Sequence, residues 1–266
     1  MSLVFDGVDD RVSSTSATGI PSGTPMSMCC VVRLTSLTSF PALIQLGDDG
    51  SGSNYGWYIN PSGLLDIYAN VLDVFSATGV VTGAWLFIGI SSATETSHRY
   101  FCYNYETRAV ILNETSVEDP GSFATPGVAT FQLGAYNNGG TYSNFLDGEI
   151  AWLGLYTKDF TIDTGSAFQA LAFLGPYAFG APDLFFDFLE SSGTAARERI
   201  ANQAWTLTNF PASPWRAVNL PGPWWTRGAH RVIRPQAVAT AIDPGLLHYN
   251  APGNQLTPHY PRAVPF

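Results

Sequence analysis

Apolar and polar residues alternate along much of residues 1–212. In MSMCCVVRLTSL, one face of an extended segment carries Met26, Met28, Cys30, Val32 and Leu34. A period of two is typical of a β-strand that buries one face. The same period predicts further strands over residues 42–47, 84–92, 99–105, 129–136 and 148–156.

Short polar connections join these strands. GWYINPSGLLDIYAN predicts a hairpin with Pro61-Ser62-Gly63 as its turn. Many short strands with polar turns are typical of a two-sheet antiparallel sandwich. One helix is predicted over AFQALAFL, where Phe168, Leu171 and Ala172 share a face and Gly175-Pro176 ends it. Residues 183–190 are predicted to form another strand. Residues 194–203 have a helical composition but lie between two strand-like segments, so their secondary structure is left open.

Four segments together resemble a known family. They are LVFDGVDDRV (3–12), AWLFIGIS (84–91), the stretch 133–161 with its small loop and aromatic strand, and the stretch 184–211. Their order and spacing are similar to those of laminin-G-like, concanavalin A-type jelly-roll domains. The resemblance implies an all-β, two-sheet antiparallel jelly-roll sandwich over residues 1–212. The family includes lectins, adhesion modules, glycosidases and accessory domains on bacteriophage particles, so the fold leaves the function open.

Residues 213–266 have no counterpart in that family. Ten of the eighteen prolines lie from Pro211 onward, and proline is excluded from helix interiors and central strands. Disorder is the simplest interpretation of such a segment, but its many large aromatic residues favour an extended, Pro-rich C-terminal arm that lies along another surface. The residues predicted to bind a partner are Trp215, Trp224, Trp225, Arg227, Arg231, Arg234, Tyr249, Tyr260, Arg262 and Phe266.

Charge indicates what that partner surface is like. From Trp215 onward the arm has five arginines and one acid, a charge of +4, which leaves −13 for residues 1–214 of a chain whose net charge is −9. A basic arm on an acidic body favours docking on acidic protein surface, such as another copy of the chain. Arginine with tryptophan also binds single-stranded nucleic acid, but the arginines are sparse and the body would repel phosphate.

The sequence disfavours enzyme chemistry. Glycosidases use two carboxylates roughly 5–10 Å apart, and the catalytic branch of this family places them at alternate positions of one strand. Glu149 begins such a strand, yet Ala151 and Leu153 follow on its face, so Glu149 is expected to face solvent. No other strand shows paired carboxylates. There is no Gly-x-Ser-x-Gly elbow, and the four histidines lack metal-ligand spacing.

Loop residues leave two kinds of binding open. Oxygen atoms of Asp48, Asp49, Asn54, Asn137, Asn138 and Asp147 are of the type that calcium prefers. The same residue types form turns, which is the favoured interpretation, so no metal and no cofactor is predicted. Aromatic residues beside polar loops bind sugars, and Trp57, Tyr58, Tyr136 and Tyr142 are the candidates. Tyr136 and Tyr142 flank an Asn-Asn-Gly-Gly loop and are the favoured glycan contacts, whereas Trp57 alternates with Ile59 as a core residue does.

The remaining features concern location. Cys29 and Cys30 are neighbours on a strand and point to opposite faces, so they are expected to be free thiols, as is Cys102. No signal peptide and no membrane-spanning stretch are expected.

The leading hypothesis is a non-enzymatic virion structural protein assembled in a host cytoplasm, a bacteriophage capsid decoration (cement) protein attached through its arm. Its partners would be the major capsid protein or other copies of itself in a homo-oligomer. The alternative is a glycan-binding, lectin-like module of a tail fibre or adhesion protein.

Overall fold

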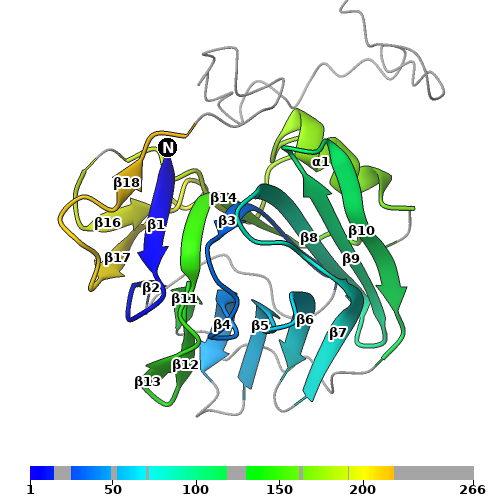
Figure 1. Ribbon diagram of the computed structural model, residues 1–266, viewed down its shortest axis with the longest axis horizontal. Coiled ribbons are helices and arrows are strands. Elements are labelled where there is room, and N and C mark those ends of the chain that lie inside the picture. Colours follow the sequence, from blue (N-terminus) through cyan, green and yellow to red (C-terminus); the bar gives the residue numbers. More distant parts are fainter. Residues whose placement is uncertain are drawn as a thin grey trace, which may run out of the picture. The chain divides into compact units, whose positions relative to one another are not determined.

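The structure is a computed structural model that describes residues 1–14, 25–48, 53–69, 72–118, 130–161, 164–190 and 192–218. Two antiparallel sheets, A and B, face each other (Figure 1). Sheet A contains, in spatial order, β10 (Ala109–Ser116), β9 (Ser97–Asn104), β8 (Trp85–Thr94), β3 (Met26–Leu34), β14 (Asp147–Tyr156), β1 (Ser2–Asp6) and β18 (Trp215–Arg216), and β15 (Leu184–Phe186) also pairs with β14. Sheet B contains β16 (Ala195–Arg197), β17 (Ala204–Thr208), β2 (Arg11–Ser14), β11 (Phe131–Leu133), β4 (Ala42–Asp48), β5 (Ser53–Ile59), β6 (Leu64–Ala69) and β7 (Leu72–Gly79). The predicted jelly-roll sandwich is confirmed.

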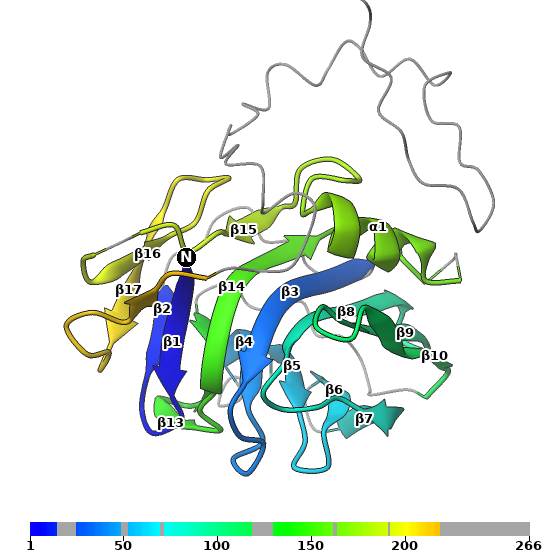
Figure 2. The ribbon, with the colours of Figure 1, turned by 45° about the horizontal axis from the view of Figure 1, so that its top comes forward.

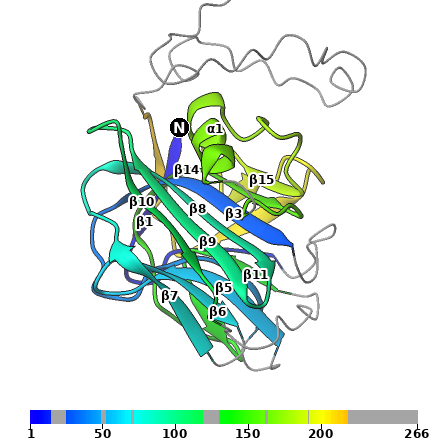
Figure 3. The ribbon, with the colours of Figure 1, turned by 90° about the vertical axis from the view of Figure 1, so that its right-hand side faces the viewer.

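Strand β3 of sheet A is buried on both faces. Its residues Met28, Cys30 and Val32 pack between the two sheets, as the alternation predicts. Cys29 and Val31 point to the opposite side, where they belong to a second apolar cluster together with helix α1 (Ser166–Leu174). Figure 3 shows α1 on the side of sheet A that faces away from β5, β6 and β7. The long partner strand β14 runs alongside β3 (Figure 2).

The predicted helix is confirmed with its buried face. Phe168, Leu171 and Ala172 are buried, and the N–H of Gly175 closes the helix on the carbonyl of Leu171. The ring of Phe168 stacks on Phe101 with centroids 5.7 Å apart. Strand β8 makes room for it with Gly89, where a Cβ would lie 2.4 Å from that ring. The helix is therefore built into the outer face of sheet A.

The structure settles the other local predictions. The hairpin of β5 and β6 is confirmed, with Gly63 in its turn at φ 83°. The open segment 194–203 begins with strand β16 and is not helical. Strands β7 and β10 were not predicted. All three cysteines are buried free thiols, as expected, and burial raises the pKa of the Cys29, Cys30 and Cys102 thiols.

The first residues of the predicted arm belong to the sandwich. Strand β18 pairs with β1 through Ser2–Arg216 and Leu3–Trp215, beyond the boundary predicted at residue 212. The Trp215 side chain is 8% exposed and packs in the core between the sheets. This tryptophan was predicted to bind a partner, but here its indole contributes to the body's own core. The other predicted arm contacts, from Trp224 to Phe266, lie outside the described residues.

The sequence predicted no membrane-spanning stretch. Within the described ranges, no helix is both long and apolar enough to cross a membrane.

Candidate functional site

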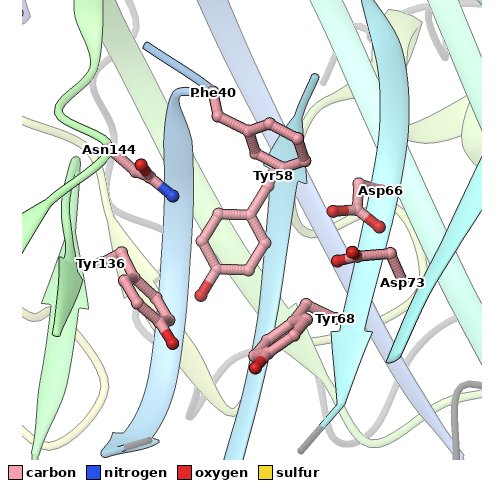
Figure 4. A pocket seen from close by; sticks show the side chains of 7 residues that line it. All are labelled: Phe40, Tyr58, Asp66, Tyr68, Asp73, Tyr136 and Asn144. Carbon is pink, nitrogen blue, oxygen red and sulfur yellow. The ribbon is translucent and has the colours of Figure 1, made fainter. Parts of the chain in front are cut away.

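A pocket of about 280 Å³ lies on the outer face of sheet B. Its lining is aromatic and acidic: Phe40, Tyr58, Asp66, Tyr68, Asp73, Tyr136 and Asn144. Figure 4 shows three tyrosine side chains gathered around one region and the two aspartates side by side. None of these lining residues carries a positive charge at neutral pH.

Three neighbouring strands present these side chains through simple alternation. In β5, β6 and β7 the residues Trp57, Ile67 and Val74 point into the core between the sheets. The residues beside them in the sequence therefore point outward. Tyr58 is the register partner of Asp66, and Tyr68 is the register partner of Asp73. The register of two adjacent hairpins thus places aromatic rings and carboxyl groups on one patch.

The tyrosine rings form a compact edge-to-face group. Tyr58 and Tyr136 have ring centroids 6.0 Å apart, Tyr58 and Tyr68 also 6.0 Å, and Tyr68 and Tyr136 6.1 Å. The three interplanar angles lie between 70° and 85°, the arrangement that the quadrupoles of aromatic rings favour. The ring of Tyr58 lies across Gly56, where a Cβ would come within 2.5 Å of the ring carbons. A glycine at this position is therefore needed for the ring to lie against the sheet.

Loop residues complete the rim. Phe40 and Asn144 both have positive φ, at 57° and 54°, a region that bulky residues such as phenylalanine rarely adopt. The carbonyl of Asn144 accepts a hydrogen bond of 3.0 Å from the N–H of Ala42, which ties the two loops together. Residues held in such conformations are concentrated at binding sites. Here they direct a ring and an amide at the pocket.

The hairpin of β12 (Tyr136–Asn138) and β13 (Thr141–Ser143) brings in the third tyrosine. It is fixed on sheet B by the side chain of Gln45, whose Nε2 donates to the carbonyl of Asn137 at 3.0 Å. The N–H of Asn137 donates in return to Oε1 of Gln45 at 2.5 Å. This two-way contact with the buried Gln45 places Tyr136 at the pocket.

Asp66 and Asp73 form a pair of carboxyl groups. Asp66 is fully buried. Burial first, and then the charge and hydrogen bond of Asp73, raise the pKa of Asp66 from 3.8 to about 9, against the lowering effect of a hydrogen bond from the backbone of Val74. Burial also raises the pKa of Asp73, although its hydrogen bond with Asp66 lowers it. At neutral pH Asp66 therefore keeps a proton, which it shares with Asp73 through their hydrogen bond.

This pair was not predicted. The expectation that no other strand carries paired carboxylates concerned alternate positions of one strand, whereas Asp66 comes from β6 and Asp73 from β7. A signal was available, because each acid stands beside core residues in an alternating segment and so points outward. What the sequence did not show was strand β7.

Glu149 is not the solvent-facing residue that was expected. It is 3% exposed, and its Oε1 pairs with the guanidinium groups of Arg33 and Arg216. Its Oε2 accepts a hydrogen bond of 2.9 Å from the Ser2 hydroxyl. Arg33 is opposite Glu149 on β3, and Arg216 comes from β18, so the carboxylate is neutralised from both sides. Glu149 fixes the start of the arm to the body.

The second candidate glycan contact lies elsewhere. Tyr142 is on the same hairpin as Tyr136, but its ring stacks under the guanidinium of Arg11, 3.8 Å from the ring centroid. It is not part of the pocket lining. The structure therefore brings Tyr136 together with Tyr58 and Tyr68 and separates Tyr142 from them.

Two of the loop residues considered for calcium can be accounted for. Asn137 acts in its turn, where its Oδ1 accepts from the N–H of Gly140, and Asp49 lies outside the described residues. Asp6, Asp9 and Asp10 do place one carboxylate oxygen each within 4.8 Å of one another. These carboxylates serve the turn after β1: Asp6 accepts from the N–H of Val8 at 2.8 Å, and Asp10 accepts from the N–H of Asp6 at 2.9 Å.

Comparison with known proteins gives structural matches alone. No protein-family model matches the chain, and no curated protein matches its sequence. A "putative carbohydrate binding protein" from Bacteroides ovatus has a TM-score of 0.53 and 10% identity, over 79% of this chain and 59% of that one. A heptameric SAP-like pentraxin from Limulus polyphemus has a TM-score of 0.46 and 12% identity, over 64% and 81%. The LG1-3 region of the laminin α2 chain has a TM-score of 0.46 and 10% identity, over 60% and 32%. At 10% identity the likeness to the Bacteroides ovatus protein shows the fold alone, and it agrees with the two-sheet jelly roll of this chain.

Proposed function

We propose that the chain is a glycan-binding, lectin-like module whose ligand occupies the pocket on sheet B. The observation that carries this proposal is the grouping of three tyrosines, one phenylalanine and two carboxyl groups in one cavity. Aromatic faces bind the C–H faces of sugar rings, while carboxylate and amide oxygens accept hydrogen bonds from sugar hydroxyls. The Bacteroides ovatus protein, which is named for carbohydrate binding, has the same fold, and this agrees with the proposal.

The hairpin offers a matched pair of variants. Tyr136→Ala removes a ring from the pocket, and Tyr142→Ala removes one from the same hairpin outside the pocket. On a glycan array, we expect the Tyr136 variant to bind its glycan about ten-fold more weakly or worse, because one central aromatic contact is worth roughly 1.4 kcal/mol or more. Tyr142→Ala should bind as the native chain does. An array without any bound glycan, or equal binding by all three proteins, would contradict the proposal.

We infer further that the module does not hydrolyse its ligand. Glycosidases hold their two carboxyl groups roughly 5–10 Å apart, so that a sugar or a water fits between them. Asp66 and Asp73 instead interact through a direct side-chain hydrogen bond, and Glu149 is occupied by two arginines. In a polysaccharide panel assayed for new reducing ends we expect no turnover. Turnover that disappears in Asp66→Asn or in Glu149→Gln would show the opposite.

A second candidate function concerns the arm. We propose that the chain is also a structural component of a virus particle, a bacteriophage capsid decoration protein attached to neighbouring virion proteins through residues 219–266. The support is the fixed start of the arm, since Trp215 is buried in the sandwich and Arg216 pairs with Glu149. The rest of the arm combines prolines, aromatic anchors and arginines. A glycan pocket on such a particle would bind the surface of a host cell.

A further inference from the structure

The pair of carboxyl groups in the pocket lacks a cationic partner. Asp66 is fully buried, and the described lining residues include no lysine, arginine or histidine. A buried carboxyl group either keeps its proton, as Asp66 does, or is paired with a cation, as Glu149 is in this same chain. The Asp66–Asp73 pair therefore provides the anionic side of an ion pair, and the cation has to come from a ligand.

We propose that the pocket selects a saccharide with a free amino group, whose ammonium group replaces the proton shared by Asp66 and Asp73 and lies between their carboxylates. The proposal rests on the proposed glycan-binding function and specifies its ligand class. An ammonium group has three N–H donors and a positive charge, so it can donate to both carboxylates at once. A sugar hydroxyl donates one hydrogen and adds no charge, so one carboxylate would keep the shared proton.

The aromatic residues favour the same ligand. Tyrosine rings attract cations through their faces when the cation lies within about 6 Å of the ring centroid. Tyr58 is in register with Asp66, and Tyr68 is in register with Asp73. Each carboxyl group thus has a ring directly beside it on the neighbouring strand. An amino sugar would place its ring against tyrosines and its ammonium at the aspartates.

Proton balance makes the proposal measurable. The free pair holds one proton at neutral pH, because the pKa of Asp66 is raised to about 9 by burial and then by Asp73. Binding of an ammonium group expels that proton to solvent, and the complex then contains two carboxylates and one cation. The other titratable groups around Asp66 are the phenols of Tyr58, Tyr68 and Tyr136 and that of Tyr100 on β9, whose pKa is raised by burial and then by Asp66. The ordinary pKa of a tyrosine phenol is about 10, so the aspartate pair is the expected source of the released proton.

Three trimers with one skeleton test this inference by calorimetry on the full chain. They are the β-1,4-linked trimers of glucosamine, N-acetylglucosamine and glucose, which differ in the group on C2. We expect the glucosamine trimer to bind about ten-fold more tightly than the other two, as a charge-assisted bond permits. Titrations at pH 7 in two buffers of different ionisation enthalpy should show the release of up to one proton for this trimer alone.

Variants separate the outcomes. Asp73→Asn, at a more exposed position, should remove both the preference and the proton release, whereas Glu106→Gln removes an exposed charge from the turn after β9 and should change neither. If the three trimers bind alike without proton release, the amine inference is overturned while the glycan-binding function stands. If none binds and the glycan array is also empty, the proposed function fails as well. Proton release on titration with calcium chloride instead would identify a metal site and overturn the amine assignment.

Discussion

Replacing Asp66 with asparagine is expected to make the protein markedly more stable at alkaline pH. The pKa of Asp66 is about 9 in the folded chain, against 3.8 as its ordinary value. Between these values the unfolded chain binds fewer protons at this residue than the folded chain does. The free energy of unfolding therefore falls as pH rises, by about 1.4 kcal/mol per pH unit for one group, and the decline ends above pH 9.

Urea unfolding of the native chain and the variant at pH 5 and pH 8 measures this contribution. Asparagine has the shape of the protonated carboxyl group, so the two proteins should be similar in stability below pH 3.8, and the variant should already be the more stable protein at pH 5. From pH 5 to pH 8 its advantage should grow by up to about 4 kcal/mol, since three pH units separate the measurements. The difference between the two proteins isolates Asp66 from all other titrating groups.

Asp73 supplies the control. In Asp73→Asn the buried Asp66 remains but loses its charged neighbour, which is the second cause of its raised pKa. The stability of this variant should still fall with pH, over a narrower range. If the native chain and Asp66→Asn show parallel curves from pH 5 to pH 8, Asp66 is ionised in the folded state and the shared proton does not exist.

The sequence predicted those parts of the fold that depend on local periodicity. Alternation in residues 26–34 identified β3 and its face toward sheet B, and the spacing of Phe168, Leu171 and Ala172 identified α1. It did not show that the other face of β3 is buried too, because Cys29 and Val31 are covered by a helix more than 130 positions away in the chain. Such coverage is a property of the packing and leaves no periodic signal.

The candidate site was predicted in part for a related reason. Tyr136 was identified from its polar loop, but Tyr58 and Tyr68 are brought together by the register of β5 and β6. Tyr136 lies beside them because Gln45 holds its hairpin on sheet B. Asp66 and Asp73 are seven positions apart, and they meet since β6 and β7 form a hairpin whose register places Tyr68 opposite Asp73. Glu149 shows the same limit, because one of its two arginines comes from residue 216. Contacts between strands decide these sites, and a single sequence does not contain the register.

The structure changes how the arm has to be tested. A chain that ends at Pro214 would lose β18, so Trp215 would leave the core and Glu149 would lose Arg216. Any defect of that variant could come from the body. A chain that ends at Val218 keeps the strand and both contacts, and it removes residues 219–266 alone.

We expect the chain ending at Val218, and the full chain with Trp224→Ala and Trp225→Ala, to fail in self-association or particle attachment while the body stays folded. Ordering an extended segment costs roughly 1–2 kcal/mol of backbone entropy per residue, which proline reduces in part. Burial of large aromatic anchors has to offset that cost, and binding energy is usually concentrated in a few tryptophan, tyrosine and arginine residues. Arg227, Arg231 and Arg234 would then set the register on an acidic surface more than the affinity.

Sedimentation velocity of the purified chain measures self-association. Co-sedimentation with virus particles measures attachment to a particle. Circular dichroism of each variant checks that the sheets persist. Phe179→Ala is the matched control, since this phenylalanine is 41% exposed on the body and its loss removes an aromatic side chain without touching the arm. It should sediment as the native chain does. If the chain ending at Val218 joins the oligomer or the particle as tightly as the full chain, attachment depends on the body, and the acidic sandwich itself must provide the contact surface.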